Sequence, residues 1–240
     1  ESMRLPAIFD TIPEVLRDAG YATGAFTEGL VMAGYNGFNQ GFDTYTDGVF
    51  AKPLLSGAAE ATFKQAQQWL DIHKEIPFFL FVHTYEIHAP YQPPAPFLGK
   101  YGPPEPAVID PMKNALTDAD APIMIDRYDE GIAYTDAALG ELLDYLKNSG
   151  LTENTIIFLF SDHGEEFYDH GGVAHHETLY REQLHVPLII RMPGATPPTG
   201  RVSRKVSHLD FFATVMDALN MDYTAPITSH SLLPLIQQDG

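Results

Sequence analysis

The 240-residue chain contains no cysteine, which excludes both a disulfide framework and a thiolate metal site and leaves the compartment open. Basic residues are scarce, because 14 lysines and arginines stand against 32 aspartates and glutamates, for a formal net charge of −18. This charge argues against nucleic acid or an anionic membrane surface as a partner. An anionic substrate would need a local positive site, such as a metal ion, to offset the acidic field.

Long apolar runs are also missing, so we predict no membrane-spanning segment. The first ten residues, ESMRLPAIFD, lack the basic-then-apolar pattern of a signal peptide, and an extracytoplasmic location stays open because a signal could precede them. The composition, 45% hydrophobic and 19% charged, is typical of a globular protein with an ample core.

Helical and strand patterns alternate along the chain. Thr11 and Glu14 stand at capping-box spacing and Gly20 suits a helix end, which predicts a helix between them. Further helices are expected at about 56–74, 121–149 and 207–220, and strands at 21–26, 77–85, 155–160 and 186–194. Apolar strands separated by helices predict an α/β fold, a mostly parallel sheet with helices on both faces, in one domain over residues 1–240.

Three finer expectations concern burial and loops. The aromatic run at 77–85 is expected to be buried on both faces, and the proline-rich segment 89–111 to form an irregular loop. The helix at 121–149 is expected to carry one apolar stripe made of Tyr128, Ile132, Leu139, Leu142, Leu143 and Leu146.

Polar side chains follow the ends of two predicted strands. Asp162 and His163 stand just past strand 155–160, and His88 just past strand 77–85. In open α/β sheets ligands bind beyond the carboxyl ends of the strands, so these residues are expected at one rim. Four histidines and five acidic residues crowd residues 161–180, in the same region.

The residue types alone leave two interpretations of each position. A carboxylate oxygen and a neutral imidazole nitrogen can bind one metal ion if Gly164 lets the chain turn, or Asp162 caps the next segment and His163 is a surface histidine. His88 is either a proton donor near neutral pH or a histidine bonded to a loop carbonyl. His175 and His176 form a solvated pair, or one of them contacts an anion.

The other charged side chains are expected to have ordinary roles. Glu165, Glu166 and Asp169 are expected to be solvated charges, and His170 has no assignment. The histidines expected to be structural or on the surface are His73, His83, His185, His208 and His230.

Two long stretches of the sequence resemble the sulfatase family of the alkaline phosphatase superfamily. They are YDEGIAYTDAALGELLDYLKNSGLTENTIIFLFSDHGEEF and HHETLYREQLHVPLIIRMPG. Five shorter segments support the resemblance: TIPEVLRDAGYATGAF, GFNQGFDTY, HAPYQPP and, near the end of the sequence, VSHLDFFATVMDALNM and SHSLLPLI. Together these pieces cover nearly the whole chain in the family's order, which is far more specific than any one of them.

The resemblance implies roles for four residues. Asp162 and His163 match two ligands of the family's single divalent cation, and His163 stands where many members have Asn. An all-oxygen site suits calcium, whereas an imidazole favours manganese or zinc, so we expect calcium or manganese before zinc. His88 matches the histidine that protonates the leaving alcohol. His176 matches a lysine or histidine that contacts the sulfate group, with His175 as the adjacent alternative.

The sequence departs from the family's pattern in two places. The paired metal-binding aspartates and the Cys/Ser-x-Pro-x-Arg segment, whose first residue becomes the formylglycine nucleophile, do not occur in it and are expected upstream of Glu1. The family's small C-terminal subdomain is expected beyond its end, and the 240 residues alone are expected to have no turnover and weak metal affinity. Glu28 stands in a segment where many members hold the sulfate with a lysine and a histidine.

The resemblance therefore implies metal-dependent hydrolysis of a sulfate ester of a small molecule or glycan. Hydrolysis of a phosphate or phosphonate ester is the alternative within the superfamily, kept open by Asp-His in place of Asp-Asn. A third possibility is a non-catalytic remnant that binds an anionic glycan or a partner. The sequence identifies neither the substrate nor the oligomeric state.

Overall fold

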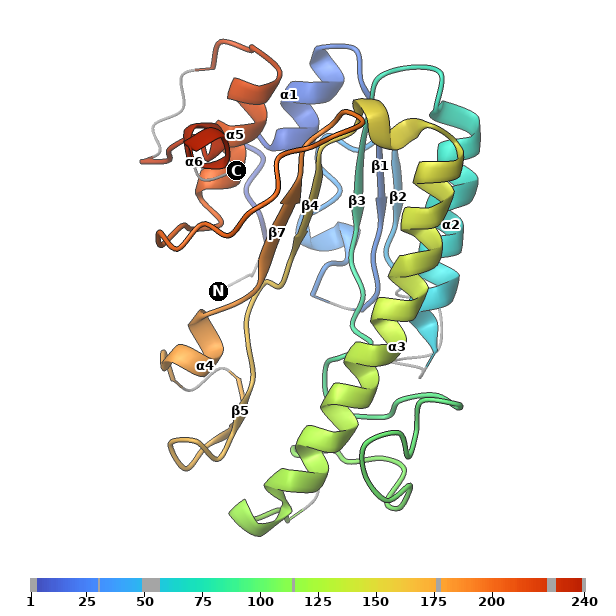
Figure 1. Cartoon of the computed structure of the whole chain (residues 1–240), viewed down its shortest axis with the longest axis vertical. Coiled ribbons are helices and arrows are strands. Elements are labelled where there is room, and N and C mark those ends of the chain that lie inside the picture. The colour runs from blue at the N-terminus through green and yellow to red at the C-terminus, as the bar shows by residue number, and fades with distance from the viewer. Residues whose placement is uncertain are drawn as a thin grey trace. The chain divides into compact units, whose positions relative to one another are not determined.

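The computed structural model describes residues 4–29, 31–48, 57–113, 115–175, 178–223 and 228–238 (Figure 1). The chain divides into two compact units. The first comprises Glu1–Leu151 and Phe160–Leu188, and the second Thr152–Leu159 and Ile189–Gly240. This division does not test whether the chain folds as one domain, which stays a prediction.

The first unit is built on a three-stranded parallel sheet in the order β2-β1-β3. Its strands are β1 (Ala22–Phe26), β2 (Thr44–Thr46) and β3 (Phe78–Val82). Every residue of β1 is buried, as expected for a central strand. The residues of β3 are only partly buried, so the expectation of burial on both faces was wrong. Among the described residues of the first unit, β3 pairs with β1.

Helix α1 (Ile12–Asp18) begins with the predicted capping box. The Glu14 carboxylate accepts a hydrogen bond from the Thr11 backbone N–H at 2.9 Å, and Thr11 Oγ1 accepts one from the Glu14 N–H at 3.4 Å. The helix ends before Gly20, whose φ of 91° lies in the left-handed region that glycine adopts without strain. Both predicted boundary signals are therefore confirmed.

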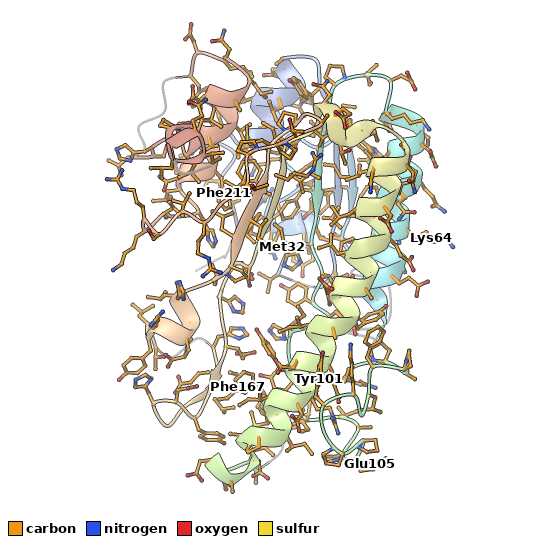
Figure 2. All side chains as sticks on the ribbon, in the orientation of Figure 1. Met32, Lys64, Tyr101, Glu105, Phe167 and Phe211 are labelled. Carbon is orange, nitrogen blue, oxygen red and sulfur yellow. The ribbon has the colours of Figure 1, made fainter. Side chains whose placement is uncertain are left out.

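Helix α2 (Ala58–His73) packs on β1 and β3 through Trp69. A Cβ on Gly24 would lie 2.7 Å from the indole ring, so this close approach of helix and strand requires glycine. The indole N–H donates to Thr44 Oγ1 at 3.1 Å, which ties α2 to β2 as well. Lys64 points outward from the opposite side of the helix (Figure 2).

Helix α3 (Ala121–Asn148) runs beside α2, and its buried stripe differs from the predicted one. Leu142 and Leu146 are buried as expected, whereas Ile132 and Leu143 are 40% and 36% exposed. The buried residues are Met124, Arg127, Glu130, Gly131, Tyr134, Ala138, Leu142 and Leu146. The apolar pattern was misleading because two of these positions carry charged side chains.

Those two side chains, Arg127 and Glu130, form an ion pair with 0% exposure and an Nη1–Oε2 distance of 2.9 Å. Arg127 also donates to the carbonyl oxygens of Pro103 and, at 3.0 Å, Pro106. Glu130 Oε1 accepts from the Tyr101 N–H at 3.1 Å. The pair therefore fastens the proline-rich loop to α3.

The rest of the first unit is made of short elements. In the proline-rich loop one isolated antiparallel bridge joins Tyr91 to Ile109, and the loop is otherwise irregular, as predicted. The remaining elements are the 3-10 helices η1 (Gly34–Asn36) and η2 (Asp118–Asp120), the antiparallel pair β5 (Glu166–Phe167) and β6 (Val173–Ala174), and α4 (Arg181–Leu184).

The second unit is organised around β4 (Ile157–Phe160), which pairs with β7 (Leu188–Arg191). Its helices are η3 (Leu151–Asn154), α5 (Asp210–Ala218) and α6 (Leu233–Gln238). Arg191 donates to the Thr152 carbonyl at 2.6 Å, and the rings of Phe158 and Phe211 lie 5.4 Å apart. The strands and the helix predicted here are confirmed. No helix in the described ranges is long and apolar enough to span a membrane.

We predict that Glu130→Ala lowers the free energy of unfolding by about 3–5 kcal/mol, because it leaves the Arg127 guanidinium buried without its carboxylate. Glu141→Ala, on an exposed position of the same helix, should change it by less than about 0.5 kcal/mol. Urea denaturation followed by circular dichroism measures both values. Equal effects of the two substitutions would contradict the structural role of the pair.

Candidate functional site

The chain emerging from β4 places Asp162 and His163 side by side. His163 Nδ1 lies 2.8 Å from the Gly164 carbonyl oxygen, which can only accept, so Nδ1 carries the proton and Nε2 has a lone pair. That Nε2 lies 3.8 Å from Asp162 Oδ2, with both side chains partly exposed. An oxygen and a nitrogen at this separation can bind one divalent cation, and a carbonyl partner behind the imidazole is the usual support for such a ligand.

Gly164 holds this turn against the segment that carries α4. Its N–H donates to the Gln183 carbonyl at 2.9 Å. A Cβ at this position would lie 2.0 Å from the Glu182 carbonyl oxygen, so no other residue fits without moving the backbone. The glycine is needed for this close approach of two backbones.

Two further histidines lie against His163. The ring of His175 lies 3.9 Å from that of His163 and 4.9 Å from that of His88, between centroids. His88 Nδ1 donates to the Ala89 carbonyl at 2.6 Å, which leaves Nε2 as its other functional nitrogen. The structure thus brings together the residues that follow two different strands, as expected from the strand-end rule.

Of the two neighbouring histidines proposed to contact an anion, His175 is the one the structure places here. His176, the first choice from the sequence, lies outside the described residues. In the sequence, the distance to Thr178 favoured His176, and His175 is the residue one position before it. The role of either residue stays a prediction.

Glu165 fixes the position of His175. Its Oε1 accepts from His175 Nδ1 at 2.9 Å and its Oε2 from the Tyr91 hydroxyl at 3.0 Å, with all three side chains buried or nearly so. Burial, and secondly the Glu165 charge, raise the pKa of Tyr91, so the phenol stays neutral and donates. The expectation that Glu165 is a solvated charge was wrong.

Glu166 was also expected in solvent, yet it is 1% exposed. Its carboxylate accepts from the N–H groups of His170 and Gly172 at 3.1 and 2.8 Å, and from Thr178 and Gln183 at 3.3 and 3.1 Å. Burial acts to raise the pKa of Glu166, but these hydrogen bonds outweigh it and the pKa is lowered. The carboxylate organises the β5–β6 turn, and Asp169 is exposed as predicted.

A second group of side chains that could bind a metal ion lies nearby. It consists of Glu166, His170 and Glu182, whose possible ligand atoms lie within 4.8 Å of one another. His170 Nδ1 lies 2.6 Å from Glu182 Oε1, and its ring stacks on Tyr180 at 3.7 Å. Because both Glu166 oxygens already accept two hydrogen bonds each, this arrangement is explained without an ion. Asp162 and His163 are therefore the better candidate ligands.

His83, which the sequence analysis treated as structural or on the surface, is a buried neighbour of Asp162, His163 and His88. It directly follows β3, and its buried Nδ1 has no hydrogen-bond partner among the described residues. Burial lowers the pKa of His83, and the neighbouring imidazoles of His163 and His88 act in the same direction. The Asp162 carboxylate opposes them. Its place at a strand end was the signal that could have identified it.

Glu28 does not take part in an anion cradle. Its carboxylate accepts from Thr84 Oγ1 at 2.9 Å, from the Tyr85 N–H at 3.0 Å, and from Thr62 Oγ1 of α2. These bonds order the residues between β3 and His88. Glu28, whose negative charge differs from the lysine and histidine of many family members in this segment, thus has a structural role.

Comparison with known proteins identifies the family. Residues 4–221 match the pattern that defines the sulfatase family. The chain belongs to the sulfatase family. It is 34% identical to arylsulfatase K of Danio rerio over 44% of this chain and 20% of that protein. The matched part therefore spans about a fifth of this relative's length.

Two solved structures show the same alkaline phosphatase-like α/β fold. One is a protein in complex with its substrate D-glucosamine-2-N,6-O-disulfate, with a TM-score of 0.77, 20% identity, and coverage of 99% of this chain and 66% of that one. The other is the phosphonate monoester hydrolase of Agrobacterium radiobacter, with a TM-score of 0.77, 20% identity, and coverage of 99% and 63%. At this identity the likeness establishes the fold, a parallel sheet with helices.

We predict that Glu165→Ala destabilises the chain by about 1–3 kcal/mol, because it leaves the buried Tyr91 hydroxyl without its acceptor. The same substitution should release the His175 ring and shift its NMR resonances. Asp169→Ala, an exposed acid in the same loop that accepts from the Phe167 N–H at 3.2 Å, is the matched control and should leave the His175 resonances unchanged. Unchanged His175 resonances in Glu165→Ala would show that the carboxylate does not position this ring.

Proposed function

We propose that the full-length protein hydrolyses sulfate esters with a divalent cation at Asp162 and His163. The observation that carries this proposal is the convergence of four groups in a member of the sulfatase family: an Asp-His pair with an Oδ2–Nε2 distance of 3.8 Å, His175 against it, and His88 beside His175. Asp162 and His163 supply two ligands, and the remaining ligands would come from outside this sequence.

Asp162 and His163 would hold the cation through a carboxylate oxygen and an imidazole nitrogen. A bound cation polarises the ester oxygens and lowers the pKa of a nucleophile. The mixed oxygen and nitrogen donors favour manganese more than an all-oxygen set would, and we propose manganese or calcium before zinc. The net charge of −18 makes a local positive charge necessary for an anionic ester to bind.

His88 would act as the general acid. Its Nδ1 is committed to the Ala89 carbonyl, so Nε2 would carry the proton that passes to the leaving alcohol oxygen as the sulfur–oxygen bond breaks. His175, with His176 as the alternative next to it, would offset negative charge on the non-bridging oxygens when protonated. The nucleophile is proposed to be a formylglycine in a segment outside the 240 residues.

A sulfate ester of a small molecule or glycan is the proposed substrate. The structural neighbour bound to D-glucosamine-2-N,6-O-disulfate supports a sugar sulfate. The alternative is a phosphate or phosphonate ester, which is favoured by the Asp-His pair and by the likeness to a phosphonate monoester hydrolase. A non-catalytic anion-binding domain would have no need of a cation at Asp162 and His163.

We predict that the full-length protein hydrolyses p-nitrophenyl sulfate faster than p-nitrophenyl phosphate, and that His88→Ala lowers kcat on the order of 100- to 10,000-fold, because the leaving oxygen loses its proton donor. His230→Ala, an exposed histidine of the other unit, should leave kcat unchanged. Preference for the phosphate would support the alternative. Absence of both activities would support the non-catalytic domain.

A second prediction concerns metal binding by the 240-residue chain. Manganese should bind weakly in isothermal titration, because half of the ligand set is outside the chain, and Asp162→Ala should abolish the heat. His170→Ala should leave binding unchanged. Loss of binding in His170→Ala instead would place the ion at the Glu166–His170–Glu182 group.

A further inference from the structure

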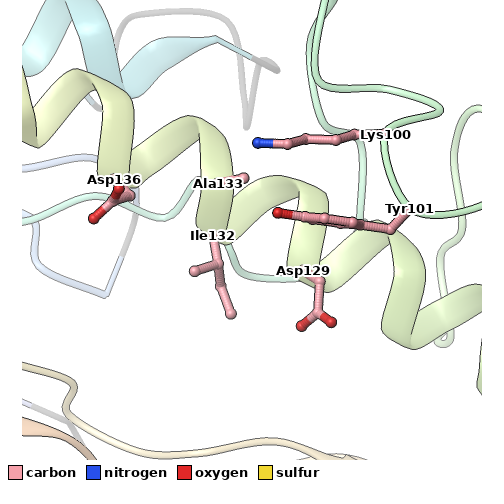
Figure 3. A pocket seen from close by; sticks show the side chains of 6 residues that line it. All are labelled: Lys100, Tyr101, Asp129, Ile132, Ala133 and Asp136. Carbon is pink, nitrogen blue, oxygen red and sulfur yellow. The ribbon is translucent and has the colours of Figure 1, made fainter.

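A groove that shares no lining residue with the histidine site lies between α3 and the proline-rich loop (Figure 3). It has a volume of about 340 Å³, which lies within the size range of small-ligand sites. Its walls and floor come from two segments, the proline-rich loop and the helix. The lining residues are Lys100, Tyr101, Asp129, Ile132, Ala133 and Asp136.

Tyr101 gives the groove an aromatic wall. The residue is 53% exposed, although it sits on a loop that is otherwise held against the helix. Figure 3 shows its ring edge-on, with Lys100 on one side and Asp129 on the other. Lys100 Nζ lies 5.4 Å from the centre of the Tyr101 ring and 5.5 Å from that of Phe97, so two aromatic rings hold the ammonium in place.

The backbone that carries this wall is held in place before any ligand arrives. The Tyr101 N–H donates to the buried Glu130, whose partner Arg127 binds the carbonyl oxygens of Pro103 and Pro106. A fully buried ion pair therefore positions an exposed tyrosine. Pre-organisation of this kind reduces the ordering cost of binding.

The floor alternates polar and apolar groups in the order of the helix. Asp129 and Asp136 are seven residues apart, so two turns of α3 present them on the same face, with Ile132 and Ala133 between them. Burial, and secondly the neighbouring Asp126, raise the pKa of Asp129, as expected for a carboxylate that is partly withdrawn from water.

We propose that this groove binds a pyranose ring that is uncharged or carries an amine. The C–H face of such a ring can pack on the part of the Tyr101 ring that Lys100 leaves exposed, because the π face carries negative charge that attracts polarised hydrogens. Its hydroxyls or amine can donate to Asp129 and Asp136, while Lys100 can donate to a ring or hydroxyl oxygen. A sulfated ring fits poorly, since its sulfate would face two carboxylates.

The groove thus selects a sugar of different charge from the proposed ester substrate. The proposal does not depend on hydrolysis at the histidine site, because binding here can be measured without turnover. In a glycan with both sulfated and unsulfated residues, the groove would hold an unsulfated one.

The test is isothermal titration of the 240-residue chain with chitobiose, glucosamine, spermidine and a heparin-derived sulfated disaccharide. We expect saturable binding of chitobiose or glucosamine and none of the sulfated disaccharide. Tyr101→Ala should weaken this binding at least about tenfold, because the sugar loses its contact with the aromatic ring. A tenfold change in affinity corresponds to about 1.4 kcal/mol of binding free energy. Tyr101→Phe should retain it, because the hydroxyl is not required. Asp129→Asn should weaken it, because the substitution removes the negative charge and one of the two acceptor oxygens.

Tyr35→Ala is the matched control, since it removes another well exposed tyrosine, and should leave the affinity unchanged. Circular dichroism checks that each variant is folded. Three results would overturn the proposal: no sugar binding, sugar binding insensitive to Tyr101→Ala, or spermidine binding alone that depends on Asp129 and not on Tyr101. The last would identify a simple cation site.

Discussion

The carboxylate of Glu165 joins two loops that are far apart in the sequence. One oxygen holds His175, which lies between His88 and His163, and the other holds Tyr91, three residues after His88. Tyr91 is part of a buried cluster with Ile109 and Met124, to which Tyr128 and Phe167 contribute. The position of His175 therefore depends on the packing of a hydrophobic core through one charged group, and an unpaired carboxylate at this depth would be strongly unfavourable.

Local signals in the sequence predicted much of the architecture. The capping box of Thr11 and Glu14 located α1, and the long helical pattern located α3 to within a residue. The apolar strands followed by polar residues led to Asp162, His163 and His88, which do converge with His175. These predictions succeeded because strand ends and helix caps are set by neighbouring residues.

The failures at charged positions share one cause, which is that burial of a charge depends on partners distant in the sequence. Glu165 and Glu166 look like surface acids until their donors are known. Arg127 and Glu130 occupy the buried face of α3, where periodicity favoured Ile132. An apolar pattern identifies positions with hydrophobic side chains. It misses buried charged side chains whose hydrogen bonds and ion pairs are made inside the protein.

Membership of the sulfatase family gives this chain its fold, and we propose that Asp162 and His163 form half of a cation site with His88 as the proton donor beside it. The central claim is that Asp162 and His163 bind one metal ion together. Anomalous diffraction from crystals of the chain soaked in manganese chloride tests it most directly. We expect a single strong peak within bonding distance of Asp162 Oδ2 and His163 Nε2. A peak at Glu166, His170 and Glu182 instead, or no peak at the Asp-His pair, would contradict the claim.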